Sequence, residues 1–113
     1  MKLAIIGSRT FNNYSLLESY LNPHKNNISL VISGAAKGTD SLSEKWANEN
    51  NIKTLIFPAD WNKYGKRAGY IRNEDIIKNC DNVIAFWDKK SKGTKHALSL
   101  CKKYNKLYRI IEI

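Results

Sequence analysis

The stretch ISLVISGAAKGTD, residues 28–40, joins an apolar run to a glycine-rich turn and is followed by the pattern of a helix. Gly34 and Gly38 favour a tight turn, because glycine tolerates positive φ and lets a ligand approach the backbone. The apolar run reads as a buried strand. The stretch therefore predicts a strand, a short loop and a helix in direct succession.

Polar residues at the end of this turn can cap the helix. Thr39, Asp40 and Ser41 are each suited to the cap, and Ser41 with Glu44 fits a capping box. A helix start also offers free N–H groups and a partial positive charge, which suit a phosphate. An ordinary capped turn and one wall of a phosphate site both remain open at this point.

Four further apolar runs occur along the chain: KLAII (2–6), KTLIF (53–57), NVIAFW (82–87) and LYRIIEI (107–113). The first four runs in chain order are near-continuous, which is typical of strands buried on both faces. Helical patterns lie between the runs, as in the pairs Leu17 with Leu21 and Leu42 with Trp46. Strands that alternate with helices predict an α/β fold with a parallel five-stranded sheet and helices on both faces.

The 113 residues, 42% of them hydrophobic, predict a single domain over residues 1–113. No apolar run approaches the roughly 18 residues of a membrane span, so we expect no membrane partner. The N-terminal run of about five apolar residues is shorter than a signal-peptide core. Cys80 and Cys101 lack metal-ligand spacing, so we expect no metal, and isolated thiols favour a cytoplasmic location.

The formal net charge is +9, from 19 lysines and arginines against 10 acidic residues. Such a charge favours a negatively charged partner, which includes a nucleotide, a nucleic acid or an acidic surface. A basic but otherwise unremarkable surface is the alternative. Lysines outnumber arginines, which weakens the case for bidentate recognition of phosphate.

Residues that follow the strands matter most, because open parallel sheets bind ligands beyond the carboxyl ends of their strands. These residues are Gly7-Ser8-Arg9, 33–38, 58–61 and 88–94. Neither the G-x-G-x-x-G nor the G-x-x-x-x-G-K-[ST] pattern occurs, so we expect no dinucleotide cofactor and no P-loop. In KSKGTKHAL, residues 90–98, a glycine and a threonine open the last helix among several lysines, which again suits a phosphate.

The segment PADWNKYGKRAGY, residues 58–70, is the longest stretch without a clear pattern. Its Trp61 and Tyr64 either stack on a base or pack against the core. Arg72 follows in the helical pattern, where it either pairs with Asp75 three residues on or points into a cleft as an anion anchor.

The segments GSRTF, SGAAKGTD, PADW, YGKRAGYIRNEDII and KGT together resemble the small YspA-like proteins of the SLOG superfamily. That superfamily is related to the lysine-decarboxylase-like (LOG) phosphoribohydrolases and to the DprA/SMF DNA-processing proteins. The resemblance implies a Rossmann-like domain with strand order 3-2-1-4-5 and a nucleotide-type ligand above the sheet edge. The ligand-binding residues that it implies are Gly7, Ser8, Arg9, Ser33, Gly34, Ala35, Gly38, Asp40, Asp60, Trp61, Arg67, Arg72, Asn73, Gly93 and Thr94.

The chain departs from the phosphoribohydrolase branch at one decisive place. That branch resembles P-G-G-x-G-T-x-x-E, and here Gly93 and Thr94 remain while Ala97 stands at the glutamate position. Cleavage of an N-glycosidic bond needs a placed carboxylate, so such an enzyme would need one from elsewhere in the chain.

Three functions remain open. The leading one is a module that binds a nucleotide or nucleotide-derived ligand, as a sensor or a sequestering protein. The second is an enzyme that splits a base from a ribose phosphate, with Arg72 as phosphate anchor and Asp40 or Asp75 as acid/base. The third is single-stranded nucleic acid binding, which the charge and the aromatic residues favour. The relatives also suggest a homodimer.

Overall fold

A computed structural model describes residues 1–113. The elements in chain order are β1 (Lys2–Gly7), α1 (Tyr14–Leu21), η1 (Asn22–Asn27), β2 (Leu30–Ser33), α2 (Thr39–Glu49), β3 (Lys53–Ile56), α3 (Trp61–Tyr64), η2 (Gly65–Arg67), α4 (Ala68–Asn79), β4 (Asn82–Trp87), α5 (Lys92–Lys103) and β5 (Leu107–Glu112). No helix is long and apolar enough to cross a bilayer.

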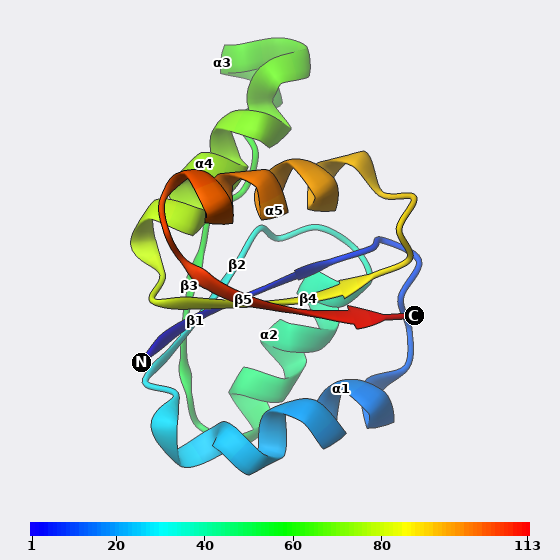
Figure 1. Cartoon of the computed structure of the whole chain (residues 1–113), viewed down its shortest axis with the longest axis vertical. Helices are drawn as coiled ribbons and strands as arrows, with labels where there is room; N and C mark the ends of the chain where they lie inside the picture. The colour runs from blue at the N-terminus through cyan, green and yellow to red at the C-terminus, as the bar shows by residue number, and fades with distance from the viewer.

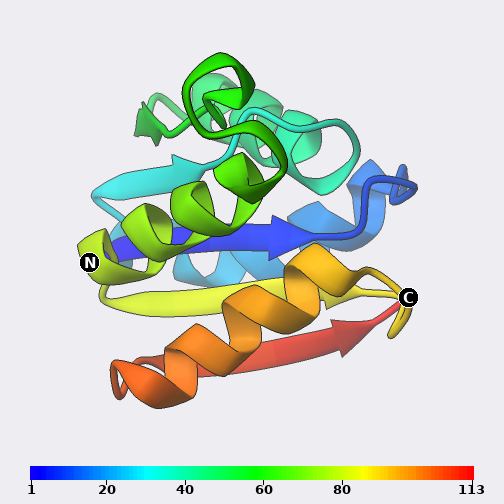
Figure 2. The same cartoon turned by 90° about the horizontal axis from the view of Figure 1, so that it is seen from above.

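The five strands form one parallel sheet in the order β3-β2-β1-β4-β5 (Figures 1 and 2). Every strand is joined to the next by a helical crossover, as the alternation of apolar runs and helical patterns predicted. The strand order reverses beside β1, so the carboxyl ends of β1, β2 and β4 meet at the edge where such sheets bind ligands. The predicted fold class and strand order are confirmed.

Helices cover both faces of the sheet, and each face has its own core. In Figure 1, α4 and α5 lie above the sheet, and α1 and α2 lie below it. Trp46 of α2 is fully buried below the sheet among apolar residues of α1, β1 and β4. Ile77 of α4 and Cys101 of α5 are fully buried above it. Successive residues of β1 and β4 point into opposite cores, which explains their continuous apolar runs.

The expectation that the run at 53–57 forms a strand buried on both faces is wrong. β3 lies at the edge of the sheet, where Leu55 and Ile56 are 38% and 39% exposed. The order of strands in space decides which apolar strand is central, and a local run of apolar residues carries no such information. β5 forms the other edge, and Leu107 is its most exposed apolar residue.

The two cysteines provide a test of the packing of α4 and α5 on the sheet. Cys80 and Cys101 are both buried free thiols, and burial raises the pKa of Cys101 to about 11. Because the thiolate is the reactive form, we expect no reaction of the folded protein with an aromatic disulfide reagent at pH 7–9. In denaturant both thiols should react. Rapid labelling of the folded protein would show that these helices open readily.

Candidate functional site

Ser8 holds the turn after β1 in place from inside the protein. Its backbone N–H donates to the carbonyl of Phe86 at 2.9 Å, and its carbonyl accepts the hydroxyl proton of Thr39 at 3.0 Å. Its own hydroxyl accepts from the backbone N–H of Asp88, also at 3.0 Å. Ser8, which the resemblance implied to be a ligand residue, therefore ties together β1, α2 and the end of β4.

The predicted capping box does not form. α2 begins at Thr39, two residues before Ser41, and Gly38 occupies the cap position without a side-chain bond. The Ser41 hydroxyl instead donates to the carbonyl of Ala36, and the Glu44 carboxylate accepts from the hydroxyl of Ser33 at 2.9 Å. These bonds fix the glycine turn itself, which leaves the first N–H groups of α2 without a capping side chain.

Three adjoining cavities form one cleft along the carboxyl edge of the sheet, and we call it the edge cleft. The first cavity, of about 280 Å³, lies between the end of β1, α4 and the start of α5. The second, of about 340 Å³, lies between the turns after β2 and β3. The third, of about 210 Å³, lies beside α3 and the start of α4. Arg9 and Arg72 line all three cavities, so the two guanidinium groups stand at their junction.

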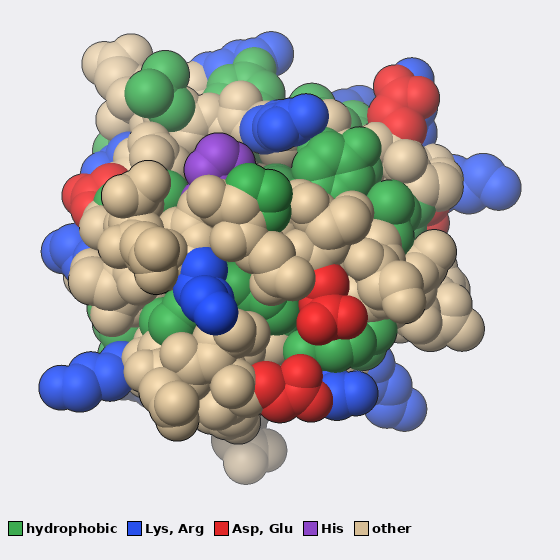
Figure 3. All heavy atoms as spheres, turned by 90° about the horizontal axis from the view of Figure 1, so that it is seen from below, with side chains coloured by type: hydrophobic (Ala, Val, Ile, Leu, Met, Phe, Trp, Pro, Cys, Tyr) green, Lys and Arg blue, Asp and Glu red, His purple; other side chains and the backbone are tan.

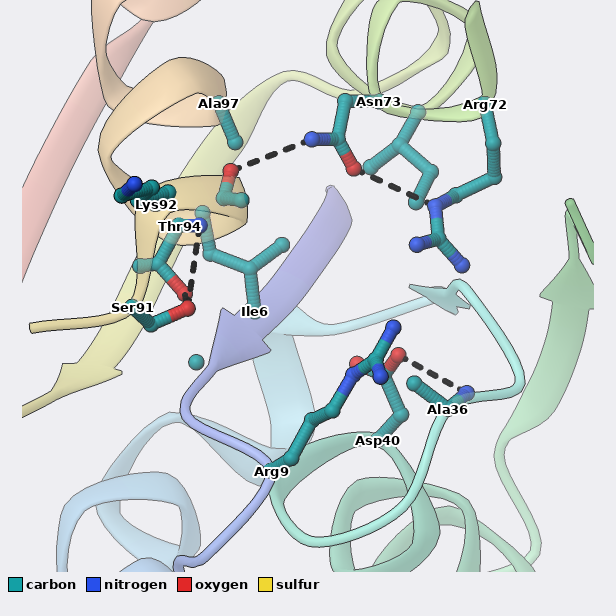
Figure 4. Close-up of a pocket in the computed structure, with 13 residues that line it drawn as sticks. Ile6, Arg9, Ala36, Asp40, Arg72, Asn73, Ser91, Lys92, Thr94 and Ala97 are labelled. Carbon is teal, nitrogen blue, oxygen red and sulfur yellow. Dashed lines mark hydrogen bonds between the residues drawn. The ribbon is translucent and has the colours of Figure 1, made fainter. Parts of the chain in front are cut away.

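Arg72 is held across the cleft by hydrogen bonds from two directions. Its Nη1 donates to the carbonyl of Gly34 at 2.6 Å. Its Nε donates to Oδ1 of Asn73 at 3.2 Å, a bond that Figure 4 shows. Burial lowers its pKa, although a guanidinium remains charged throughout the physiological range. The alternative pair of Arg72 with Asp75 does not form, and Asp75 is exposed outside the cleft. Arg72 therefore has the position of an anion anchor.

Asn73 connects Arg72 to the last helix. Its amide nitrogen donates to the carbonyl of Gly93 at 3.1 Å and lies 3.3 Å from Nδ1 of His96. The His96 ring packs against Tyr70, with ring centroids 4.4 Å apart. A single buried amide thereby fixes both the orientation of Arg72 and the distance between α4 and α5.

Asp40 is the one carboxylate that lines the edge cleft. It is 9% exposed, and its Oδ2 accepts from the backbone N–H of Ala36 at 3.1 Å (Figure 4). Burial raises its pKa, which the Ala36 N–H and the nearby Arg72 charge counteract in part. Asp40 forms no ion pair within 4.0 Å, and it lines the first cavity.

Asp40 is expected to lower the stability of the unliganded protein at neutral pH. The folded protein favours the protonated form of Asp40, because burial raises its pKa. The stability gained in this way is fully present below the unfolded-state pKa and is lost as pH rises through the folded-state pKa. We expect Asp40→Asn to raise the Tm at pH 7 by roughly 5 °C, which corresponds to about 1 kcal/mol in a domain of this size. Thermal unfolding at pH 7 and near pH 4 would measure this, and the gain should shrink in acid. A lower Tm at pH 7 would contradict the burial argument.

Residues 61–70 are helical, contrary to the expectation of an irregular loop over 58–70, and only residues 58–60 of that stretch are irregular. Asp60 caps α3 by accepting from the backbone N–H of Lys63 at 3.0 Å. The short helix projects from the body of the molecule (Figure 1) and leaves Trp61 53% exposed where it lines the second and third cavities. Trp61 therefore does not pack into the core, whereas Tyr64 contacts Lys63 on the same helix.

The last helix presents its N-terminus to the first cavity. Ser91 caps it, since its Oγ accepts from the backbone N–H of Thr94 at 3.4 Å. Ser91, Lys92, Gly93 and Thr94 all line the cavity (Figure 4), and the earliest N–H groups of the helix have no partner within the helix. Ala97 lies one turn further along and places a methyl group in the same cavity.

The structure brings most of the implied ligand residues together. Those that line the edge cleft are Gly7, Arg9, Gly34, Ala35, Asp40, Trp61, Arg72, Asn73, Gly93 and Thr94. Ser8, Ser33, Gly38 and Asp60 instead hold the loops in shape, and Arg67 is exposed outside the cavities. Sequence reasoning missed Tyr70 as a cleft residue and included Ser91 only within the range 88–94, although a serine directly before a helix is itself a signal for the cap.

Charge is distributed unevenly between the cleft and the rest of the surface. Basic side chains around the edge cleft outnumber its one carboxylate: Arg9, Lys37, Lys66, Arg72 and Lys92. On the face seen from below in Figure 3, where α1 and α2 cover the sheet, acidic side chains are interspersed among the basic ones. No group of three or more His, Cys, Asp and Glu side chains is placed to hold a metal ion.

The model of the YspA, cpYpsA-related SLOG family matches residues 1–64, more than half of the chain. The chain belongs to this family. It is 32% identical over 75 residues to the Gene 61 protein of Mycobacterium phage D29, a match that covers 61% of this chain and 60% of the phage protein. The chain thus spans less than two thirds of that relative.

Two solved structures share the fold. The X-ray structure of DNA processing protein A (DprA) from Streptococcus pneumoniae superposes with a TM-score of 0.81 at 20% identity, over 99% of this chain and 50% of DprA. DNA processing protein A from Helicobacter pylori, whose structure addresses its single-stranded DNA binding mode, gives a TM-score of 0.70 at 26% identity. That match covers 97% of this chain and 64% of the Helicobacter protein.

Proposed function

We propose that the protein binds a nucleotide or a nucleotide-derived ligand in the edge cleft. The observation that carries the proposal is the position of Arg9 and Arg72 at the junction of all three cavities. Arg72 is already oriented by Gly34 and Asn73, so little side-chain entropy would be lost when an anion binds. A preorganised guanidinium is well suited to a phosphate group.

The two ends of the cleft suit the two ends of a nucleotide. The first cavity ends at the N-terminus of α5, where free N–H groups, Lys92 and the Thr94 hydroxyl favour a phosphate. The second and third cavities are flanked by Trp61, and the third also by Tyr70, two aromatic rings exposed enough to stack on a base. Phosphate and base would then lie on either side of the two arginines.

Hydrolysis by the phosphoribohydrolase route has less support. Ala97 contributes only a methyl group where that branch has its glutamate. Asp40 is the one carboxylate in the cleft that could act as an acid or base, with Arg72 as the anchor, whereas Asp75 lies outside. An enzyme would therefore need Asp40 alone to perform the proton transfers.

Single-stranded nucleic acid binding is the second candidate function. The projecting segment of α3 and η2 combines exposed Trp61 with Lys63, Lys66 and Arg67, a pairing of stacking and cationic groups that single strands use. The Helicobacter protein that shares the fold binds single-stranded DNA, which favours the same partner here. Such binding would weaken steeply as salt rises, whereas a mononucleotide contacts few charges and would show a shallow slope.

A thermal-shift screen followed by calorimetry tests the proposal. The panel holds ribonucleoside and 2′-deoxyribonucleoside 5′-monophosphates, NAD, ADP-ribose, cyclic nucleotides and a short single-stranded oligonucleotide, each at two salt concentrations. We expect at least one small nucleotide to raise the Tm with a shallow salt dependence and to be recovered intact by chromatography. Stabilisation by the oligonucleotide alone, lost at moderate salt, would overturn the proposal in favour of nucleic acid binding. Release of a free base would show an enzyme.

A further inference from the structure

The edge cleft contains a carboxylate that an anion site does not need. Asp40 is nine-tenths buried, and one oxygen is used by the Ala36 N–H. Its protein donors belong to the turn of Gly34 and Ala36, and neither Arg9 nor Arg72 forms an ion pair with it. A carboxylate can accept about four hydrogen bonds, so Asp40 in the wall of the first cavity can accept a further one from a ligand.

A phosphate cannot be that partner, because a carboxylate repels it. The parts of a nucleotide that donate hydrogen bonds are the sugar hydroxyl groups and the amino or imino groups of the base. Asp40 lines the same cavity as the start of α5, whereas Trp61 lines only the other two cavities. With the phosphate at α5 and the base at Trp61, the sugar lies between them and faces Asp40.

We infer that Asp40 accepts hydrogen bonds from the ribose hydroxyl groups of the ligand, so that the cleft selects ribonucleotides over 2′-deoxyribonucleotides. The inference rests on the proposed function, since it assigns the sugar position of that same ligand. Two adjacent hydroxyl groups can both donate to one carboxylate, and such charge-assisted bonds are roughly twice as strong as neutral ones. Removal of the 2′-hydroxyl leaves the buried oxygen without its partner, which costs more than the bond alone.

Matched pairs of nucleotides separate the sugar from the base. AMP and dAMP, GMP and dGMP, CMP and dCMP, and UMP and dUMP are titrated by calorimetry into the wild-type protein. In each pair that binds, we expect the ribonucleotide to bind roughly 10- to 100-fold more tightly, the range that one charge-assisted hydrogen bond provides. The wild-type comparison needs no mutation, so a folding defect cannot obscure it.

Two variants assign the selectivity to Asp40. Asp40→Asn keeps an oxygen for the Ala36 N–H but removes the charge. We expect the ratio of ribonucleotide to deoxyribonucleotide affinity in each pair to fall below about threefold. Glu44→Gln is the matched control, because this carboxylate lies one turn along α2, bonds Ser33 and lines no cavity. It should leave the ratio unchanged.

The outcomes distinguish this inference from the proposed function. Equal affinities for the two members of each pair would overturn the inference and leave nucleotide binding intact. A ratio that survives in Asp40→Asn would also overturn it, since the selectivity would then arise elsewhere. If no mononucleotide binds at all, both the proposed function and the inference fail.

Discussion

Replacement of Gly38 by alanine is expected to destabilise the protein by about 3 kcal/mol or more, a large part of the roughly 5–15 kcal/mol of a typical domain. Gly38 has a φ of +70°, where a side chain is strained. A Cβ atom there would lie 2.3 Å from the carbonyl oxygen of Arg9 and 2.7 Å from that of Ser8. Both contacts are to backbone, so the added methyl group can be accommodated only if the two turns separate.

Urea unfolding of Gly38→Ala beside Gly93→Ala provides the comparison. Gly93 also lies beside the cleft, but a Cβ atom there meets nothing within 4 Å. Because alanine is the better helix former, Gly93→Ala should match the wild type or gain up to about 1 kcal/mol. If Gly38→Ala were equally tolerated, the close packing of the turn after β2 on the turn after β1 would be incorrect.

The central strands were predictable from the sequence, because a strand buried on both faces has apolar side chains at successive positions. The run at 82–87 coincides with β4, in which residues 83–86 alternate between the two cores and are all apolar. The same kind of run at 53–57 gives an edge strand, because the position of a strand in the sheet depends on the whole topology. Local pattern therefore identifies strands well and places them poorly.

The location of the cleft was predictable from the sequence, but the roles of its individual residues were less so. Arg9 and Arg72 come from segments 63 residues apart in sequence, and the rule for sheet edges brings both to the same edge. The rule does not say which residue faces a ligand and which holds a loop. Ser8 and Ser33 lie at this edge yet point into the protein, where they bond Asp88 and Glu44. Hydrogen bonds between loops depend on three-dimensional distances that the sequence does not show.

Replacement of Arg72 by alanine is expected to weaken nucleotide binding by about 100-fold, the scale of a lost hydrogen-bonded charge in a partly buried site. Arg72 lines all three cavities, so any ligand that spans the cleft must pass its guanidinium group. The variant also leaves the Gly34 carbonyl without its donor, so its stability must be measured together with its affinity. Calorimetry with the tightest mononucleotide of the wild-type protein measures the loss.

A second variant moves the same group without removing it. In Gly34→Ala, a Cβ atom would lie 2.6 Å from Nη1 of Arg72 and 3.0 Å from its Cδ. The flexible end of the arginine can move away, so we expect the sheet and α4 to remain folded while the guanidinium leaves its position. Affinity should fall at least tenfold in this variant, an estimate that reflects misplacement of a positioned charge. Retained affinity would show that the position of Arg72 is unimportant.

Arg67→Ala is the matched control for both variants. Arg67 lies five residues before Arg72, is exposed, and lines none of the cavities, so its removal should change mononucleotide affinity by less than about twofold. For a single-stranded oligonucleotide, loss of either arginine should lower the affinity by a similar factor, because long-range attraction to phosphates depends on total charge more than on position. Equal losses in Arg67→Ala and Arg72→Ala would therefore assign the affinity to the basic surface, and a loss confined to Arg72→Ala and Gly34→Ala would assign it to the cleft.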